Sequence, residues 1–77
     1  MKTKKFDDIK DQCINEVLEV AYNALKEKGY NAIGQLAGFI FSDDPSYLTS
    51  HNNARAMLKA VDRDELLEHI LRYYFEG

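Results

Sequence analysis

Residues 14–25 read INEVLEVAYNAL, and this stretch decides the fold. Its apolar side chains recur at the i, i+3, i+4, i+7 and i+11 spacing of one helical face, at Ile14, Val17, Leu18, Ala21 and Leu25. Asp7 or Asp8 can accept the free amide hydrogens of a first turn, and Gly29 suits the left-handed residue that stops a helix. The pattern therefore predicts a helix from Asp7 or Asp8 to just before Gly29.

A second helix is predicted after Asn31, which can cap it. The apolar positions expected to face inward are Ile33, Leu36, Ala37, Ile40 and Phe41. Gly34 and Gly38 lie one turn apart on this helix, although glycine costs about 1 kcal/mol against alanine in a helix. We therefore expect close backbone packing at Gly34 and Gly38, either within the chain or across a dimer.

Pro45 ends the second helix, because proline cannot continue one and the flanking Asp and Ser residues favour turns. Thr49 or Ser50 can cap a third helix, whose inward residues are Ala54, Met57, Leu58 and Val61. Asp62, with Glu65 three residues later, resembles a capping box for a fourth helix. Its apolar face is expected at Leu66, Leu67, Ile70, Leu71 and Tyr74.

The composition fits one small helical domain. The chain has 77 residues, of which 45% are hydrophobic and 30% charged. The prediction is an all-α, compact bundle of four to five short helices over residues 7–77, with a flexible N-terminal tail over residues 1–6. Such a thin core is readily enlarged by dimerisation, so a homodimer is expected. No apolar run is long enough to insert into a membrane and no signal peptide is evident, which indicates a cytoplasmic protein.

The charge argues against nucleic acid, since the formal net charge is −3. One basic pattern stands out, because Arg55, Lys59 and Arg63 recur every four residues. They would form a basic strip for partner binding if helical geometry persisted between them. The other interpretation is a solvated face with local ion pairs. A helical DNA-binding module of the helix-turn-helix type remains the alternative function.

Nothing in the sequence indicates catalysis, a cofactor or a metal site. His51 and His69 lie on different predicted helices without a ligand at metal-binding spacing, so they are interpreted as surface or partly exposed residues. Cys13 is interpreted as a small buried residue. Asp43 and Asp44 lack the spacing of an EF-hand and are interpreted as turn residues. The chain is therefore predicted not to be an enzyme.

Several blocks of sequence resemble the IreB family of small regulatory phosphoproteins from Gram-positive bacteria. The blocks keep the family's order and spacing, and they are residues 24–31 (ALKEKGYN), 35–38 (QLAG), 44–47 (DPSY), 54–55 (AR) and 63–68 (RDELLE). The resemblance implies a helical homodimer acting downstream of a PASTA-type Ser/Thr kinase and its phosphatase. It also implies effects on peptidoglycan synthesis and cephalosporin resistance, through protein partners of the Clp-protease and cell-wall pathway.

The resemblance also implies a phosphorylation site in the N-terminal tail. Thr3 is the threonine of that tail, and Phe6 and Asp7 resemble the aromatic and acidic residues that follow the family's site. The tail departs from the family pattern in being short and in placing two lysines between Thr3 and Phe6. Arg55, Lys59 and Arg63 resemble a family basic region suited to protein contacts.

Overall fold

The computed structural model describes the chain from residue 4 to residue 77, and its side chains from Cys13 onward. The described chain is all-helical, which confirms the predicted fold class. Four α-helices and two 3-10 turns follow one another as α1 (Lys4–Glu27), α2 (Ala32–Ser42), η1 (Pro45–Tyr47), η2 (His51–Asn53), α3 (Ala54–Lys59) and α4 (Arg63–Glu76). Among these residues no helix is both long and apolar enough to cross a membrane.

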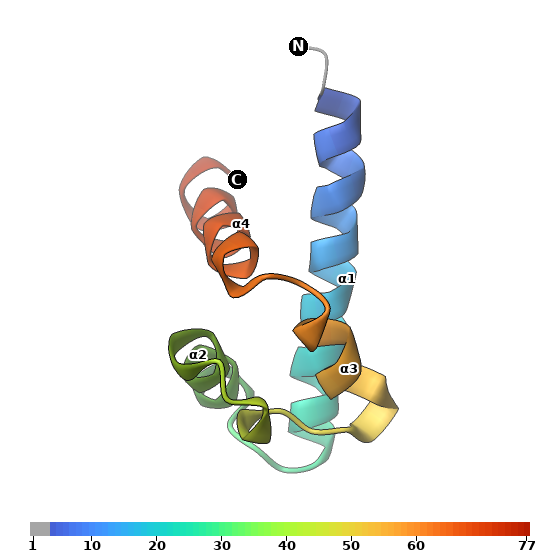
Figure 1. Ribbon diagram of the computed structural model, residues 1–77, viewed down its shortest axis with the longest axis vertical. Coiled ribbons are helices and arrows are strands. Elements are labelled where there is room, and N and C mark those ends of the chain that lie inside the picture. The colour runs from blue at the N-terminus through green and yellow to red at the C-terminus, as the bar shows by residue number, and fades with distance from the viewer. Residues whose placement is uncertain (1–3) are drawn as a thin grey trace.

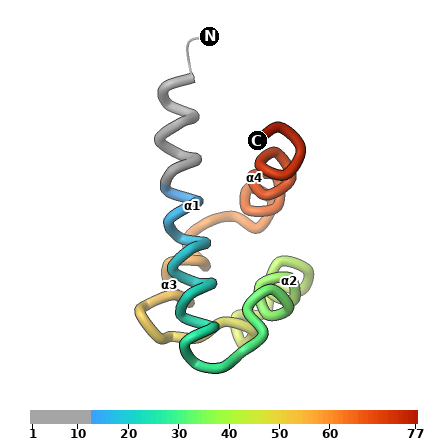
Figure 2. Tube along the Cα trace, turned by 180° about the vertical axis from the view of Figure 1, so that it is seen from behind, coloured from blue at the N-terminus to red at the C-terminus, as the bar shows by residue number. Residues whose placement is uncertain are grey.

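The long helix α1 is the axis on which the other elements pack (Figure 1). Helices α2 and α4 lie on the same side of α1, one beyond the other along its length, and the view from behind shows the same arrangement (Figure 2). Helix α3 crosses α1 near its C-terminal half and contacts it directly. Each of the three shorter helices, α2, α3 and α4, therefore contacts α1.

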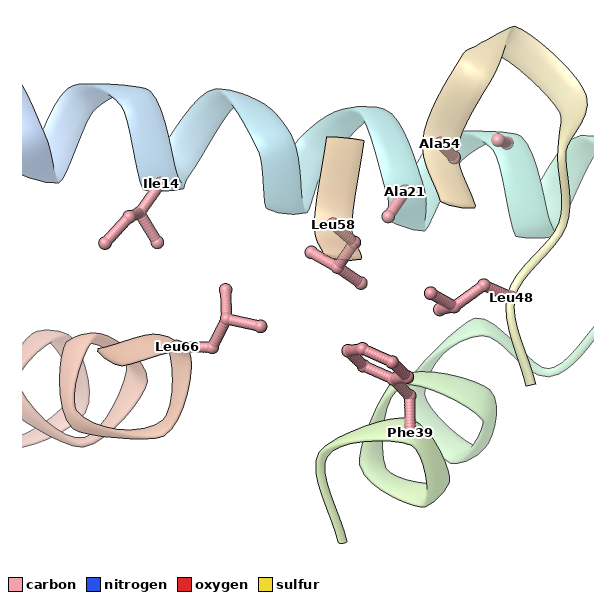
Figure 3. Close-up of a cluster of buried hydrophobic side chains, with 8 residues drawn as sticks. Ile14, Ala21, Phe39, Leu48, Ala54, Leu58 and Leu66 are labelled. Carbon is pink, nitrogen blue, oxygen red and sulfur yellow. The ribbon is translucent and has the colours of Figure 1, made fainter. Parts of the chain in front are cut away.

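The core lies where these elements meet α1. Figure 3 shows Ile14 and Ala21 of α1 pointing toward Phe39 of α2, Leu58 of α3 and Leu66 of α4. Ala24, Leu48 and Ala54 complete the cluster. The predicted α1 face is confirmed, since Ile14, Ala21 and Leu25 are buried and Val17 and Leu18 are partly buried against the cluster.

Helix α1 begins earlier than predicted and ends where predicted. It starts at Lys4 rather than at Asp7 or Asp8. Residues 4–6 contain no glycine or proline to stop a helix, so the first turn can extend backward from the two aspartates. At the other end, the N–H of Tyr30 donates to Leu25 O (2.9 Å) and the N–H of Gly29 to Lys26 O (3.0 Å), a Schellman arrangement. Gly29 takes φ 86°, as its predicted role as the stop requires.

The predicted inward face of α2 is partly wrong. The Asn31 cap is confirmed, with its Oδ1 accepting from Gly34 N at 3.3 Å. However, the buried residues are Ala32 and Phe39, with Leu36 and Ile40 packed beside them, whereas Ile33, Ala37 and Phe41 are exposed. The reason is that residues 32–42 contain no charged side chain, so periodicity alone does not distinguish the two faces.

The turn after α2 is stabilised locally. Asp43 adopts a left-handed conformation (φ 60°) and ends the helix, which confirms the predicted break. Asp44 then caps η1, because its Oδ1 accepts from Ser46 N at 3.0 Å. Hydrogen bonds from the Ser46 backbone and hydroxyl lower the pKa of the Asp44 carboxyl. Both aspartates are therefore turn residues, as predicted.

Helices α3 and α4 begin with geometry that differs from the predicted caps. Thr49 Oγ1 accepts from His51 N at 3.2 Å at the start of η2, and the last two residues of η2, Asn52 and Asn53, are left-handed and lead directly into α3. Asp62 occupies the expected N-cap position of α4, but its side chain makes no capping hydrogen bond. Of the predicted α4 face, Leu66 is buried, whereas Leu67, Ile70, Leu71 and Tyr74 are exposed.

Candidate functional site

Arg63, the first residue of α4, reaches the C-terminal end of α2. Its Nη1 donates to the carbonyl oxygens of Ile40 (2.8 Å) and Phe41 (3.4 Å), and its Nε lies 3.4 Å from Asp43 Oδ1. The last carbonyls of a helix lack partners within the helix and carry the negative end of its dipole. Arg63 therefore caps α2 from another helix and joins the two elements.

Arg55 performs a similar task for the segment after α2. Its Nε donates to Pro45 O (3.2 Å) and its Nη2 to Leu48 O (2.7 Å). The two acceptors stand at the beginning of η1 and at the residue after it, so a half-buried guanidinium spans the turn. A planar group with donors in a fixed fork suits this geometry better than an ammonium group does.

Lys59 is the third member of the expected strip, and it is exposed at the end of α3. The structure does not bring the three cations into one continuous row. Residues 60–62 separate α3 from α4, and the guanidinium groups of Arg55 and Arg63 turn to backbone carbonyls. The helix-turn-helix alternative therefore gains no support from the described part of the chain, because two of the three cations are engaged internally.

A hollow of about 570 Å³ lies beside Lys59 and Arg63. We call it the α2–α4 hollow, and it is lined by Phe39, Asp43, Lys59, Val61, Asp62, Arg63 and Asp64. The half-buried Val61 lies next to charges of both signs in this lining, which suits contact with a polypeptide segment. Within residues 13–77, no group of three or more His, Cys, Asp or Glu side chains is arranged to hold a metal ion.

Sequence reasoning missed the α2–α4 hollow for a specific reason. Phe39 is not among the residues predicted to face inward, and nothing in the prediction places the end of α2 beside the start of α4. One signal was available in the sequence. The charged residues Asp62-Arg63-Asp64 stand where the short connection 60–62 meets α4, so they lie close to a contact between helices.

The two glycines of α2 face different neighbours inside the subunit. A Cβ at Gly38 would lie 2.5 Å from Cε1 of Tyr47, so the ring of η1 packs directly on the α2 backbone. A Cβ at Gly34 would lie 2.8 Å from Nδ2 of Asn31, the residue that caps the helix. Gly38 thus marks the closest approach between α2 and the turn that follows it.

Gly38→Ala is expected to lower the free energy of unfolding by up to about 2 kcal/mol. Alanine gains about 1 kcal/mol of helix propensity, but displacing the Tyr47 ring costs about 1–3 kcal/mol. The check is urea unfolding of this variant, of Tyr47→Ala and of the double variant. In the Tyr47→Ala background the same substitution is expected to stabilise the protein, and destabilisation there would contradict the steric explanation.

The histidines and the cysteine require two corrections. His51 is half-buried, with Nε2 2.7 Å from Glu27 Oε1, which ties η2 to the end of α1. His69 is buried rather than partly exposed, because its Nε2 lies 2.6 Å from Asn15 Oδ1 between α4 and α1. Cys13 is exposed rather than buried, since the buried face of α1 runs through Ile14 instead.

The predicted phosphorylation site lies outside the described residues. Thr3 precedes the first described residue, and the side chains of Phe6 and Asp7 also fall outside the described part. The geometry above therefore concerns the folded body to which that segment is joined.

Comparison with known proteins identifies the family. The chain matches the family model described as "IreB regulatory phosphoprotein" over residues 1–76. A UPF0297 protein of Ruminiclostridium cellulolyticum is 47% identical over 73 residues, which cover 95% of this chain and 83% of that protein. A UPF0297 protein of Lachnoclostridium phytofermentans is 46% identical over 64 residues, which cover 83% of this chain and 73% of that protein. The chain therefore belongs to the IreB family of regulatory phosphoproteins, which confirms the resemblance of its sequence blocks.

Proposed function

We propose that this protein is a cytoplasmic, non-enzymatic regulator that acts by binding other proteins and is switched by phosphorylation of Thr3. The observation that carries the proposal is the match to a family of regulatory phosphoproteins over residues 1–76. That match includes Thr3, the threonine that precedes the described helices. The folded body adds exposed apolar surface and the α2–α4 hollow, which are features suited to protein contacts.

The proposed kinase is a PASTA-type Ser/Thr kinase, opposed by its phosphatase. A phosphate on Thr3 adds about −1.5 to −2 charges and three acceptor oxygens. Lys2, Lys4 and Lys5 stand next to it in the sequence and can pair with it. Because the segment precedes the core, such a change alters the surface offered to partners and leaves the packing of residues 14–66 intact.

The proposed role is control of cell-wall synthesis and cephalosporin resistance, through protein partners in Clp-dependent turnover. This part of the proposal rests on the family. The structure contributes a candidate contact surface, in which Lys59 is exposed at the edge of the α2–α4 hollow. Arg63 belongs to the same lining and fixes the end of α2, and Arg55 fixes η1. We also propose that the protein is a homodimer, since so small a core leaves large apolar side chains exposed.

Incubation with a PASTA-type kinase of the host is expected to add one phosphate to the wild-type protein and none to Thr3→Ala. Intact-mass analysis measures this directly. Thr3→Ser is the matched control and is expected to accept the phosphate, because it keeps a hydroxyl at the same position. The chain's other threonine, Thr49, accepts a hydrogen bond from His51 N and is half-buried, so it is not expected to react.

Two results would contradict the proposed switch. Phosphate retained by Thr3→Ala would place the modification elsewhere in the chain. Loss of the helical far-UV circular dichroism signal in Thr3→Ala would show that Thr3 is needed for folding, which its proposed role as a phosphorylation site does not require.

A further inference from the structure

The α2–α4 hollow carries opposite charges that do not pair with one another. It lies where α4 begins beside α2, two helices that contact each other on one side of α1 (Figure 1). Lys59, Asp62 and Asp64 belong to its lining, and all three are exposed. Within residues 13–77, none of these three side chains makes an ion pair or a hydrogen bond. Opposite charges kept apart on one concave surface are available to a ligand that carries both signs.

The remaining two charges of the lining are paired inside the subunit. Arg63 Nε lies 3.4 Å from Asp43 Oδ1, and Arg63 Nη1 donates to Ile40 O at 2.8 Å. These contacts hold the end of α2 against the start of α4 and fix one wall of the hollow. The side chains left without a partner among residues 13–77 are therefore two carboxylates and one ammonium group. Their excess of negative charge favours a ligand whose main anchor is a cation.

The shape of the hollow suits one side chain that projects from a larger molecule. Its volume of about 570 Å³ lies within the range of about 300–1,000 Å³ that is usual for binding pockets. A site for a small molecule encloses most of its ligand, whereas the three unpaired charges here are all exposed. Val61 is half-buried in the same lining and offers apolar surface to the aliphatic part of a long cationic side chain.

We propose that the α2–α4 hollow receives an arginine side chain of a partner protein, with an acidic residue beside that arginine in the same segment. The guanidinium group meets Asp62 and Asp64, because its donors point in several directions and can join two carboxylates. The acidic neighbour meets Lys59. This inference rests on the proposed function, and it specifies the binding site and the chemistry of the partner segment.

The charges of the hollow disfavour two other kinds of ligand. A phosphate group or a nucleic acid would face two exposed carboxylates for each unpaired ammonium group, and binding of phosphates depends on clustered cations. A metal ion needs several ligands at short distances. Within residues 13–77, no group of three or more His, Cys, Asp or Glu side chains is placed to hold one. A segment with charges of both signs fits the lining better than either.

The far part of α4 supplies a matched control. Glu68 and Glu76 lie on the same helix as Asp64 and do not belong to the lining of the hollow. Glu68→Gln/Glu76→Gln removes two negative charges, as Asp62→Asn/Asp64→Asn does. The two double variants therefore have the same net charge, and a difference between them reports the position of the charges.

The test is a titration of the isotope-labelled full chain with the blocked peptide acetyl-Gly-Arg-Glu-Gly-amide, followed by amide chemical shifts. Shifts are expected at Asp43 and at residues 59–64. Asp62→Asn/Asp64→Asn is expected to raise the dissociation constant at least about fivefold, since two exposed ion pairs are lost. The Glu68→Gln/Glu76→Gln control is expected to stay within about twofold of wild type. The peptide acetyl-Gly-Gln-Glu-Gly-amide, which lacks the cation, is expected to cause no shifts at these residues.

Two outcomes would overturn the inference. The first is an equal loss of affinity in the two double variants, which would show attraction to the overall negative charge. The second is the absence of shifts in the wild type up to the solubility limit of the arginine peptide. Either result leaves the proposed function standing, because phosphorylation of Thr3 is measured separately by intact mass. Far-UV circular dichroism checks the fold, and Asp64→Asn alone replaces the first double variant should that variant unfold.

Discussion

Phe39→Ala is expected to lower the free energy of unfolding by about 3–5 kcal/mol, whereas Phe41→Ala is expected to change it by less than about 0.5 kcal/mol. The two residues have the same side chain, lie two positions apart on α2, and differ in exposure. Phe39 is 1% exposed and Phe41 is 89% exposed. The pair therefore isolates burial as the cause of the difference.

The large effect follows from the place of Phe39 in the core. Figure 3 shows its ring pointing toward Leu48 and toward Leu58 of α3, in a cluster that also includes residues of α1 and α4. Truncation loses the free energy gained by burying the ring. It also leaves a cavity, because the surrounding helices cannot fully close around the smaller side chain. A domain of 77 residues has only about 4–12 kcal/mol of stability in total, so the loss is a large share of it.

Urea unfolding followed by far-UV circular dichroism is the appropriate measurement. Protein concentration must be the same for all variants, since a dimer gains apparent stability with concentration. Equal losses in the two variants would contradict the assigned orientation of α2, as would a larger loss in Phe41→Ala. A core built around Ile33 and Phe41, as periodicity first suggested, predicts that reversed order.

The elements that were predicted correctly are those with strong local signals. The α1 face depends on five apolar residues at one spacing, and its end depends on Gly29, whose positive φ other residues rarely adopt. The Asn31 cap and the break at Pro45 are likewise decided by one or two neighbouring residues. Each of these signals depends on residues close to one another in the sequence, so it can be interpreted without knowledge of the rest of the fold.

The orientation of α2 could not be obtained in the same way. Its sequence, AIGQLAGFIFS, is apolar around most of the helix, and the helix is oriented by contacts that are distant in sequence. Tyr47 packs on Gly38, and Gln35 Nε2 donates to Tyr47 O at 2.8 Å. These contacts turn Phe39 inward and Phe41 outward. Helical periodicity contains no information about them.

The candidate site shows the same limit for charged side chains. A spacing of four between Arg55, Lys59 and Arg63 describes where their Cα atoms would lie on one helix, and it assumes that the helix is continuous. The structure interrupts it at residues 60–62. A long arginine side chain can also turn toward carbonyls on another element, as Arg63 does over 23 positions to Ile40. Residue type and spacing alone do not distinguish an arginine that binds a partner from one that caps a helix.

Arg55→Met is expected to lower the free energy of unfolding by about 2–3 kcal/mol, because the carbonyls of Pro45 and Leu48 lose hydrogen bonds to a charged group. Methionine keeps much of the aliphatic length of the side chain and removes the donors. Lys59→Met is the matched variant from the same expected strip. Lys59 is exposed, and this substitution is expected to change stability by less than about 0.5 kcal/mol.

The two variants also separate support of the fold from contact with a partner. If the α2–α4 hollow binds a partner, Lys59→Met weakens that binding at unchanged stability, since Lys59 is one of the residues that line the hollow. Arg55→Met is expected to weaken binding only in proportion to the loss of folded protein. The measurements are urea unfolding for stability and titration of the partner at a temperature where both variants are folded. Full stability in Arg55→Met would contradict the stabilising role assigned to its hydrogen bonds. Arg55 would then be interpreted as a residue that is available for contact with a partner.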